Sequence, residues 1–412
     1  MERNTGTPTS LSALATVALS AALASCGGSD TCFNCGGYPP LEISTAVVAA
    51  DFNGDGHADV LQTSSVQNGL EPDPANLKTY LSAGAGAYAA PTLTADGDDP
   101  LFLASADLNG DGLPDVVSAS AEDGALAVFF NNKLAPGTFN APLVLASPGA
   151  SQVAIGDMNG DGLPDLISAD FNVSLFLQTS PGTFASPISL YPGGANWVAV
   201  GDLNGDGSAD VALTDAVGVK LLMHTGAAGS TTFAAPVAVF TQTANLNVAG
   251  ANVVAIADVN GDGLNDLIIT DPGPTGGAAP TVNVLLQDAT HPGQFLAAMS
   301  YPVAAQSLAQ SIVVTDLDGD GHPDIVVGGT GAVSILLQDA THPGTFLAAT
   351  SFSANGASEV AVADVNGDGH PDIVIASGPT HPVVNGVTTT HPGVLLQSAA
   401  APGTFSAPGD FP

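Results

Sequence analysis

Short apolar runs recur along this chain in a fixed order. Each unit opens with a run such as Gln152-Val-Ala-Ile-Gly, and a second run follows a polar, glycine-rich loop. A third run, such as Val333-Ser-Ile-Leu-Leu-Gln, ends at a turn close to Pro-Gly-Thr-Phe, and in most copies a proline then opens a fourth. The runs are short and rich in β-branched residues, and helical periodicity is absent beyond the N-terminal segment. The pattern therefore predicts four strands per unit.

The aromatic residue of that turn marks seven units: Tyr88, Phe139, Phe184, Phe233, Phe295, Phe346 and Phe405. We expect these side chains to be core anchors. A four-stranded sheet cannot bury both faces alone, whereas radial packing of several sheets covers them. The sequence thus predicts an all-β protein, a seven-bladed β-propeller over residues 41–412 with four antiparallel strands per blade.

The polar loop after the first strand is a repeated nine-residue phrase, and its copies start 56, 50, 45, 56, 58 and 48 residues apart. It reads DFNGDGHAD from Asp51, DLNGDGLPD from Asp107, DMNGDGLPD from Asp157, DLNGDGSAD from Asp202, DVNGDGLND from Asp258, DLDGDGHPD from Asp316 and DVNGDGHPD from Asp364.

Oxygen atoms at alternate positions of such a tight loop converge on one point, and calcium accepts six to eight of them at about 2.3–2.6 Å. We assign side-chain ligands to positions one, three, five and nine and a backbone carbonyl to position seven, with a glycine at position six for the turn. Magnesium is the alternative, but it prefers strict octahedral geometry with retained waters. The ligand sets are Asp51, Asn53, Asp55, His57 and Asp59; Asp107, Asn109, Asp111, Leu113 and Asp115; Asp157, Asn159, Asp161, Leu163 and Asp165; Asp202, Asn204, Asp206, Ser208 and Asp210; Asp258, Asn260, Asp262, Leu264 and Asp266; Asp316, Asp318, Asp320, His322 and Asp324; and Asp364, Asn366, Asp368, His370 and Asp372. The sequence therefore predicts up to seven Ca²⁺ ions.

An EF-hand shares positions one to nine but closes with a Glu at position twelve. Here position twelve holds Gln62, Ser118, Ser168, Leu213, Ile269, Val327 and Ile375. The runs after the loops are also β-branched, which disfavours a helix. The phrase occurs seven times, each time between the same two predicted strands. This repetition favours metal-binding loops over simple solvated turns.

The phrase DxNGDGxxD after an apolar strand, with the downstream Gly-Thr-Phe turn, resembles the FG-GAP/VCBS repeats of bacterial surface proteins and of the integrin α-subunit propeller. The resemblance covers roughly residues 41–412. It implies a propeller whose loop carboxylates bind calcium. It leaves the function open, because such repeats occur in adhesion modules, lectins and domains attached to enzymes.

Closure of the ring needs a final edge strand, and little chain remains after Phe405. We expect residues 40–44, Pro-Leu-Glu-Ile-Ser, to add that edge to the last blade.

The N-terminus carries an export signal at residues 1–25. Its apolar run, Leu11 to Ala24, is too short to span a bilayer, and it ends in Leu-Ala-Ser before Cys26. This ending resembles the bacterial lipoprotein signal, which implies lipid attachment at Cys26, and Gly27 after it favours the outer membrane. A non-lipidated secretory signal is the alternative, with a periplasmic or extracellular protein. Residues 26–40 are expected to be a flexible tether.

Cys32 and Cys35 form a CxxC pair in that tether. Such a pair can be redox-active, bind zinc or form a disulfide. A structural disulfide in an oxidising compartment is the favoured interpretation.

The chain is strongly acidic, with 39 Asp and Glu against four Lys and Arg. The loops hold 22 of the Asp residues: four in the copy that starts at Asp316 and three in each of the other six. Without the signal, Lys78, Lys133 and Lys220 are the remaining cationic side chains. A protein without a basic patch is a poor partner for nucleic acid, and we expect membrane contact only through a lipid anchor.

No catalytic or cofactor-binding residue is assigned. A mature chain without Arg cannot clamp a carboxylate or phosphate in bidentate fashion, and a single Trp, Trp197, argues against a sugar-stacking site in every blade. His291, His342 and His391 lie in His-Pro-Gly turns and are expected to be structural.

In an antiparallel blade the metal loop shares one face with the turn between the third and fourth strands. The opposite face then carries the long insertions, residues 64–76, 242–250, 271–280 and 377–391. These are a candidate binding face, or tolerated surface insertions. The sequence favours a monomeric adhesion or interaction module for a protein or glycan at the cell surface. The alternatives are a polysaccharide-degrading enzyme, which a carboxylate pair in the central channel would favour, and a structural envelope component.

Overall fold

The computed structural model describes residues 41–67, 76–97, 100–121, 123–169, 171–226, 229–241, 253–273, 279–304, 309–329, 331–354, 359–376, 383–384, 387–388 and 392–411. The chain divides into two units, Met1–Tyr38 and Pro39–Pro412. The predicted signal, the tether and its three cysteines lie outside the described residues. Within the described ranges, no helix is long and apolar enough to cross a membrane.

Seven antiparallel sheets of four strands each follow one another along the second unit. The first blade contains β2 (Val47–Ala50), β3 (Asp59–Gln67), β4 (Asn76–Tyr80) and β5 (Thr92–Ala95). The second contains β6 (Phe102–Ala106), β7 (Asp115–Ser120), β8 (Ala125–Phe129) and β9 (Leu143–Ala146), and the third β10 (Gln152–Gly156), β11 (Asp165–Ala169), β12 (Val173–Phe176) and β15 (Ile188–Tyr191). The fourth contains β16 (Trp197–Gly201), β17 (Asp210–Thr214), β18 (Gly218–Leu222) and β19 (Val237–Thr241).

The fifth blade contains β20 (Val254–Ala257), β21 (Asp266–Asp271), β22 (Thr281–Leu285) and β23 (Met299–Pro302). The sixth contains β24 (Ala309–Thr315), β25 (Asp324–Gly329), β26 (Ala332–Leu336) and β27 (Thr350–Ser353), and the seventh β28 (Val360–Ala363), β29 (Asp372–Ile375), β32 (Gly393–Leu395) and β33 (Gly409–Asp410). The predicted seven four-stranded blades are confirmed.

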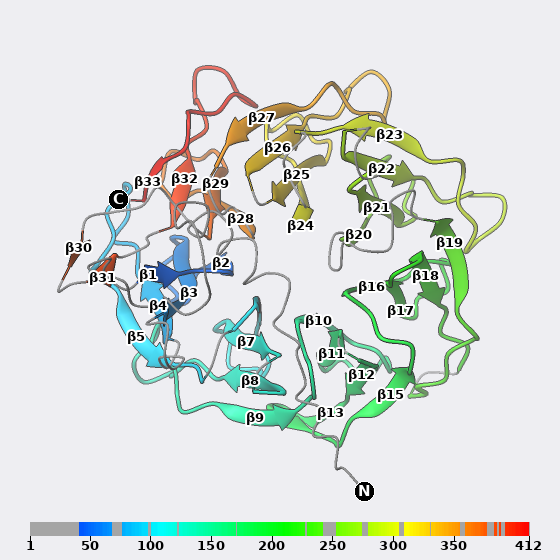
Figure 1. Cartoon of the computed structure of the whole chain (residues 1–412), viewed down its shortest axis with the longest axis horizontal. Helices are drawn as coiled ribbons and strands as arrows, with labels where there is room; N and C mark the ends of the chain where they lie inside the picture. The colour runs from blue at the N-terminus through cyan, green and yellow to red at the C-terminus, as the bar shows by residue number, and fades with distance from the viewer. Residues whose placement is uncertain are drawn as a thin grey trace, which may run out of the picture. The chain divides into compact units, whose positions relative to one another are not determined.

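The first strand of each blade lies innermost, and the fourth lies at the perimeter (Figure 1). Each innermost strand contacts those of its two neighbours, and β28 contacts β2, so the ring is closed. The second strands, such as β11 and β17, are buried along their whole length, whereas the outer strands are mostly exposed. A strand covered on both faces favours apolar residues at successive positions, which explains why these runs do not alternate between apolar and polar residues.

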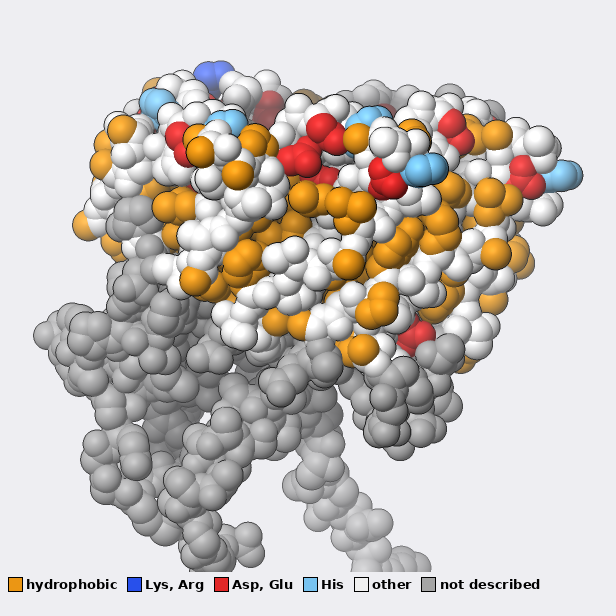
Figure 2. All heavy atoms as spheres, turned by 90° about the horizontal axis from the view of Figure 1, so that it is seen from above, with side chains coloured by type: hydrophobic (Ala, Val, Ile, Leu, Met, Phe, Trp, Pro, Cys, Tyr) orange, Lys and Arg blue, Asp and Glu red, His pale blue; other side chains and the backbone are white. Residues whose placement is uncertain are grey.

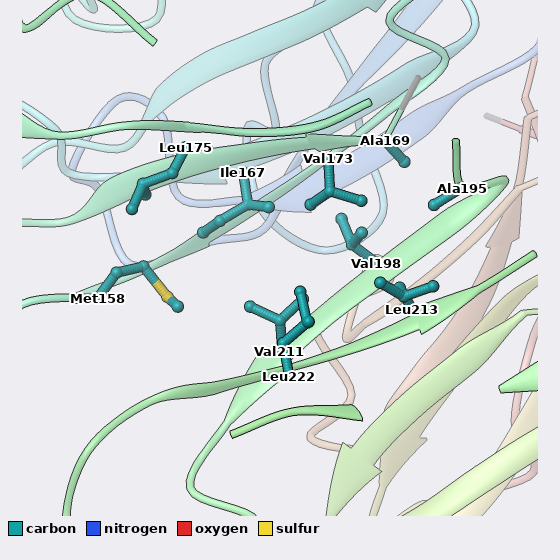
Figure 3. Packing of buried hydrophobic residues seen from close by; sticks show 10 residues of the cluster. All are labelled: Met158, Ile167, Ala169, Val173, Leu175, Ala195, Val198, Val211, Leu213 and Leu222. Carbon is teal, nitrogen blue, oxygen red and sulfur yellow. The ribbon is translucent and has the colours of Figure 1, made fainter. Parts of the chain in front are cut away.

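The hydrophobic core consists of seven clusters, each formed by two adjacent blades. In Figure 3, Ile167 and Leu175 of the third blade lie opposite Val211 and Leu213 of the fourth. The turn aromatics pack against these clusters, as predicted, one per cluster: Tyr88, Phe139, Phe184, Phe233, Phe295, Phe346 and Phe405. Each blade interface is therefore a separate, sealed core.

The ring does not close as predicted. The prediction that residues 40–44 complete the last blade is wrong. The C-terminal strand β33 forms that edge by pairing with β32. Strand β1 (Leu41–Ile43) pairs instead with the extended end of β3 and meets β31 (Val387–Thr388) at a single bridge; β31 itself pairs with β30 (Val383–Val384). Phe411 packs against Tyr80 and Tyr88 of the first blade, with ring centroids 5.7 and 4.4 Å apart. The ring closes through this aromatic contact, because the chain after Phe405 is long enough to supply its own edge strand.

Each aromatic turn pairs with the end of the third strand, as in the bridges Gln338↔Phe346 and Gln397↔Phe405. In the third blade the same turn is a small sheet of β13 (Gln178–Ser180) and β14 (Thr183–Phe184). The turn glycine has a left-handed backbone, and in the sixth blade it lies tightly against the loop of the fifth. A Cβ added to Gly344 (φ +80°) would lie 3.0 Å from Cβ of Asn260.

We predict that Gly344→Ala destabilises the protein more than Gly293→Ala. Gly293 holds the same turn position in the fifth blade with φ +78°, but its added Cβ would find no heavy atom closer than 3.4 Å. Both variants bear the backbone strain of about 1–2 kcal/mol, and Gly344→Ala adds an overpacking cost of roughly 1–3 kcal/mol. Urea unfolding in excess calcium measures the difference, and equal losses in the two variants would contradict the close approach.

Candidate metal centre

The nine-residue loops share one hydrogen-bonding pattern, in which backbone amides point at the carboxylate of position one. In the first loop, Asp51 Oδ1 accepts from Gly54 N at 2.7 Å and Oδ2 accepts from Gly56 N at 2.8 Å. The same two contacts recur in the other six loops. Gly56 has φ +86° and open space around it, so the position needs glycine for its backbone and not for room. The sequence therefore folds each loop into a tight, preformed curl.

The Asp at position nine is an anchor of the blade as well as a candidate ligand. In the second loop, Asp115 is fully buried; Oδ2 accepts from Leu108 N at 2.9 Å and Oδ1 accepts from Asn131 N at 2.7 Å. These contacts hold in all seven copies, with Phe52, Met158, Leu203, Val259, Leu317 and Val365 as the first donor and Ser82, Gln178, His224, Gln287, Gln338 and Gln397 as the second. The carboxylate thereby connects the loop to the end of the third strand.

Burial raises the pKa of these anchors above the ordinary value. The pKa is about 6 for Asp59, Asp115, Asp165, Asp266, Asp324 and Asp372, and it is also raised for Asp210. Desolvation is the largest cause, and the two backbone amides oppose it. The carboxylates of the same loop raise the pKa further. A cation bound next to such a carboxylate would stabilise its charged form.

The sixth loop brings three carboxylates together. Oxygen atoms of Asp316, Asp318 and Asp324, at positions one, three and nine, lie within 4.8 Å of one another. This group can hold a metal ion. The other loops have an Asn amide at position three in place of the third carboxylate, and their assignment as calcium ligands stays a prediction.

In the second and seventh blades, the residue after the third strand fastens neighbouring loops together, which the sequence analysis missed. Gln397 Nε2 donates to the carbonyl of Pro371 in its own blade and to that of Leu317 in the preceding blade, at 2.7 and 2.8 Å. Its Oε1 accepts from Gly403 N of the turn at 3.0 Å. Asn131 makes the equivalent contacts in the second blade, including one of 2.7 Å to Phe52 O of the first. The signal in the sequence that could have revealed this role is the Gln that recurs after Leu-Leu.

Acidic and histidine side chains gather along one edge of the described molecule (Figure 2). In the turns on the fifth and sixth blades, His291 Nδ1 lies 2.8 Å from Asp288 Oδ2, and His342 Nδ1 lies 2.9 Å from Asp339 Oδ2. These two histidines brace their turns, as predicted, while His391 and most residues of the four long insertions lie outside the described residues.

One buried carboxyl lies away from the loops, between the first and second blades. Asp96 follows β5 and is 4% exposed; its Oδ1 accepts from Ser118 Oγ at 2.6 Å. Its Oδ2 has no hydrogen-bond partner among the described residues. Burial raises the pKa of Asp96 to about 7, opposed by the Ser118 bond and reinforced by Asp123.

Asp96 should make the protein less stable as the pH rises. Its folded pKa lies above the unfolded value, so its contribution is fully present below pH about 4 and is lost as the pH rises to about 7. Asp96→Asn keeps an acceptor for Ser118 without a charge, so we expect the variant to be more stable than the parent at pH about 8, by on the order of 2–4 kcal/mol. Urea unfolding at constant calcium across that range measures this, and a pH-independent difference between the two proteins would contradict it.

The geometry defines a class, the β-propellers whose blades each carry an acidic DxNGDGxxD loop. The chain belongs to the FG-GAP-like repeat family, whose model matches residues 107–168, 157–213, 202–269, 258–327 and 316–375. No curated protein sequence matches the chain.

Solved structures share its architecture at low identity. An Agrocybe aegerita lectin that specifically recognises non-reducing terminal N-acetylglucosamine is 20% identical, with a TM-score of 0.51 over 75% of this chain and 79% of the lectin. The Vibrio cholerae biofilm matrix protein Bap1 is 14% identical, with a TM-score of 0.40 over 89% of each chain. Likeness at these identities concerns the fold alone.

Proposed function

We propose that this protein is a calcium-binding propeller at the cell surface, where it acts as an adhesion or interaction module for a protein or glycan ligand. The observation that carries the proposal is the array of seven preformed acidic loops, one per blade, with the first and sixth hydrogen-bonded to the next blade. Such loops act as locks on a rigid scaffold, and a rigid scaffold suits the presentation of recognition loops.

Calcium is the metal that the donor set favours. Each loop offers carboxylate, amide and carbonyl oxygens, which are the ligands of a hard cation. The net charge of −35 would otherwise oppose the folded state through mutual repulsion in the loops. We infer up to seven ions, with the sixth loop, which has the extra carboxylate, the tightest.

Removal of calcium should lower the melting temperature strongly. A ligand at 100 times its Kd adds about 2.7 kcal/mol per site, and the sites add together. Scanning calorimetry with calcium, with magnesium and with excess chelator measures the effect. Asp318→Asn, which makes the sixth loop match the others, should weaken one site and leave the fold intact. An unchanged melting curve in chelator would contradict structural calcium.

A polysaccharide-degrading enzyme with its site in the central channel is an alternative function. The cavity at the channel is lined by one carboxyl, Glu359, so the carboxylate pair that would favour a polysaccharide-degrading enzyme is not found among the described lining residues. A structural envelope component stays as the further alternative. Lipid attachment at Cys26 would place the propeller at the outer membrane, and a disulfide between Cys32 and Cys35 would stiffen the tether.

Glycan-array and pull-down assays with the calcium-loaded mature protein test the recognition role. Because the fold is shared with a lectin, terminal N-acetylglucosamine is a suitable first glycan. We expect calcium-dependent binding to a defined glycan or surface protein that is lost in chelator. Binding to neither, by protein shown to be folded, would favour the structural alternative, and release of sugar fragments would favour the enzyme.

A further inference from the structure

A cavity of about 250 Å³ lies at the centre of the ring. Its walls come from the innermost strands β2, β6, β16, β24 and β28. Figure 1 labels β2, β16, β24 and β28 around the central opening. Most of the lining is aliphatic. The exceptions are two aromatic residues, Phe102 and Trp197, two hydroxyls, Ser105 and Ser311, and the carboxyl of Glu359.

Glu359 is an unusual residue for this lining. It is 7% exposed, and burial raises the pKa of its carboxyl well above the ordinary value. Oε2 accepts from Val47 N at 2.9 Å, a bond that joins the last blade to the first. None of the described residues that line the cavity is Lys, Arg or His. The carboxyl thus bears a desolvation cost that no cation of the cavity wall offsets.

The bond to the next blade does not require a carboxyl. Gln152 holds the same position, five residues before its loop, in the third blade; its Oε1 accepts from Val198 N at 3.1 Å and its Nε2 donates to two carbonyls. Ser311 does the same in the sixth blade, where its Oγ accepts from Val360 N at 3.1 Å. A neutral side chain therefore suffices to connect the innermost strands. The bond to Val47 does not by itself explain why position 359 holds a Glu.

The two aromatic residues lie on the same cavity wall. Phe102 of the second blade and Trp197 of the fourth pack edge to face, with centroids 5.1 Å apart and planes at 86°. Aromatic faces attract cations, Trp most strongly, and the attraction grows in a desolvated site. An aromatic pair and a buried carboxyl around one cavity form a complementary site for a cation that has an apolar body.

We propose that the central cavity binds a small organic ammonium ion, whose charge pairs with Glu359 and whose apolar part contacts Trp197 and Phe102. A metal ion would find one carboxyl and an aliphatic wall where it needs several oxygen ligands. A sugar would find too few polar partners for its hydroxyls. The site is separate from the loops and from the surface recognition proposed above.

The test uses the calcium-loaded protein with benzylammonium as the probe, over a range of pH in which the amine stays cationic. Trp197 is the single tryptophan of the chain, so its fluorescence reports directly on the cavity. We expect saturable binding of benzylammonium and at least tenfold weaker binding of its neutral and anionic analogues, benzyl alcohol and benzoate. N-acetylglucosamine should leave the signal unchanged.

Glu359→Gln is the matched variant, since Gln at this position already accepts the same bond in the third blade. We expect it to fold with a similar melting temperature and to bind benzylammonium at least tenfold more weakly. Should that variant unfold, Ser105→Leu, which fills the cavity from β6 and keeps Glu359, should abolish binding by calorimetry. Equal affinity for the three analogues, full affinity in either folded variant, or no binding by the parent protein would overturn the proposal.

Discussion

The two faces of each blade can be buried only against the neighbouring blades, and this constraint shapes the whole ring. Seven hydrophobic clusters lie at seven interfaces, including the one between the last blade and the first, where Phe411 packs on Tyr80 and Tyr88. Because each interface is sealed separately, stability is distributed around the ring and depends on closure.

Acidic loops and blade packing are parts of one arrangement. The anchor Asp at position nine binds its own loop and the end of the third strand, and Gln397 and Asn131 reach the loop of the preceding blade. The turn glycine Gly344 of the sixth blade likewise packs on the loop of the fifth. A cation bound in a loop would therefore stabilise an interface as well as a turn. Clustered carboxylates, unfavourable by themselves, are consistent with such a lock.

Predictions from the sequence succeeded where a local pattern had a single physical meaning. Glycine at position six of the loops predicted a sharp turn, which the structure forms with a left-handed backbone, and the recurring turn aromatics predicted core anchors. The prediction failed at closure, because residues 40–44 and the C-terminal residues could each have supplied the missing edge. It also missed Gln397, whose partners in the preceding blade are far away in the sequence.

The sequence by itself determined the repeat, the strand order within each blade and the acidic loops, because these depend on residues close together in the chain. Only the tertiary structure decided how the ring closes, which carboxylates of the sixth loop converge, and what surrounds the central cavity. Phe102, Trp197 and Glu359 belong to three different blades, and each stands five residues before its loop. The repeat therefore gives them equivalent positions, but it does not show that these positions line one cavity. They meet because the innermost strands converge on one axis once all seven interfaces have formed.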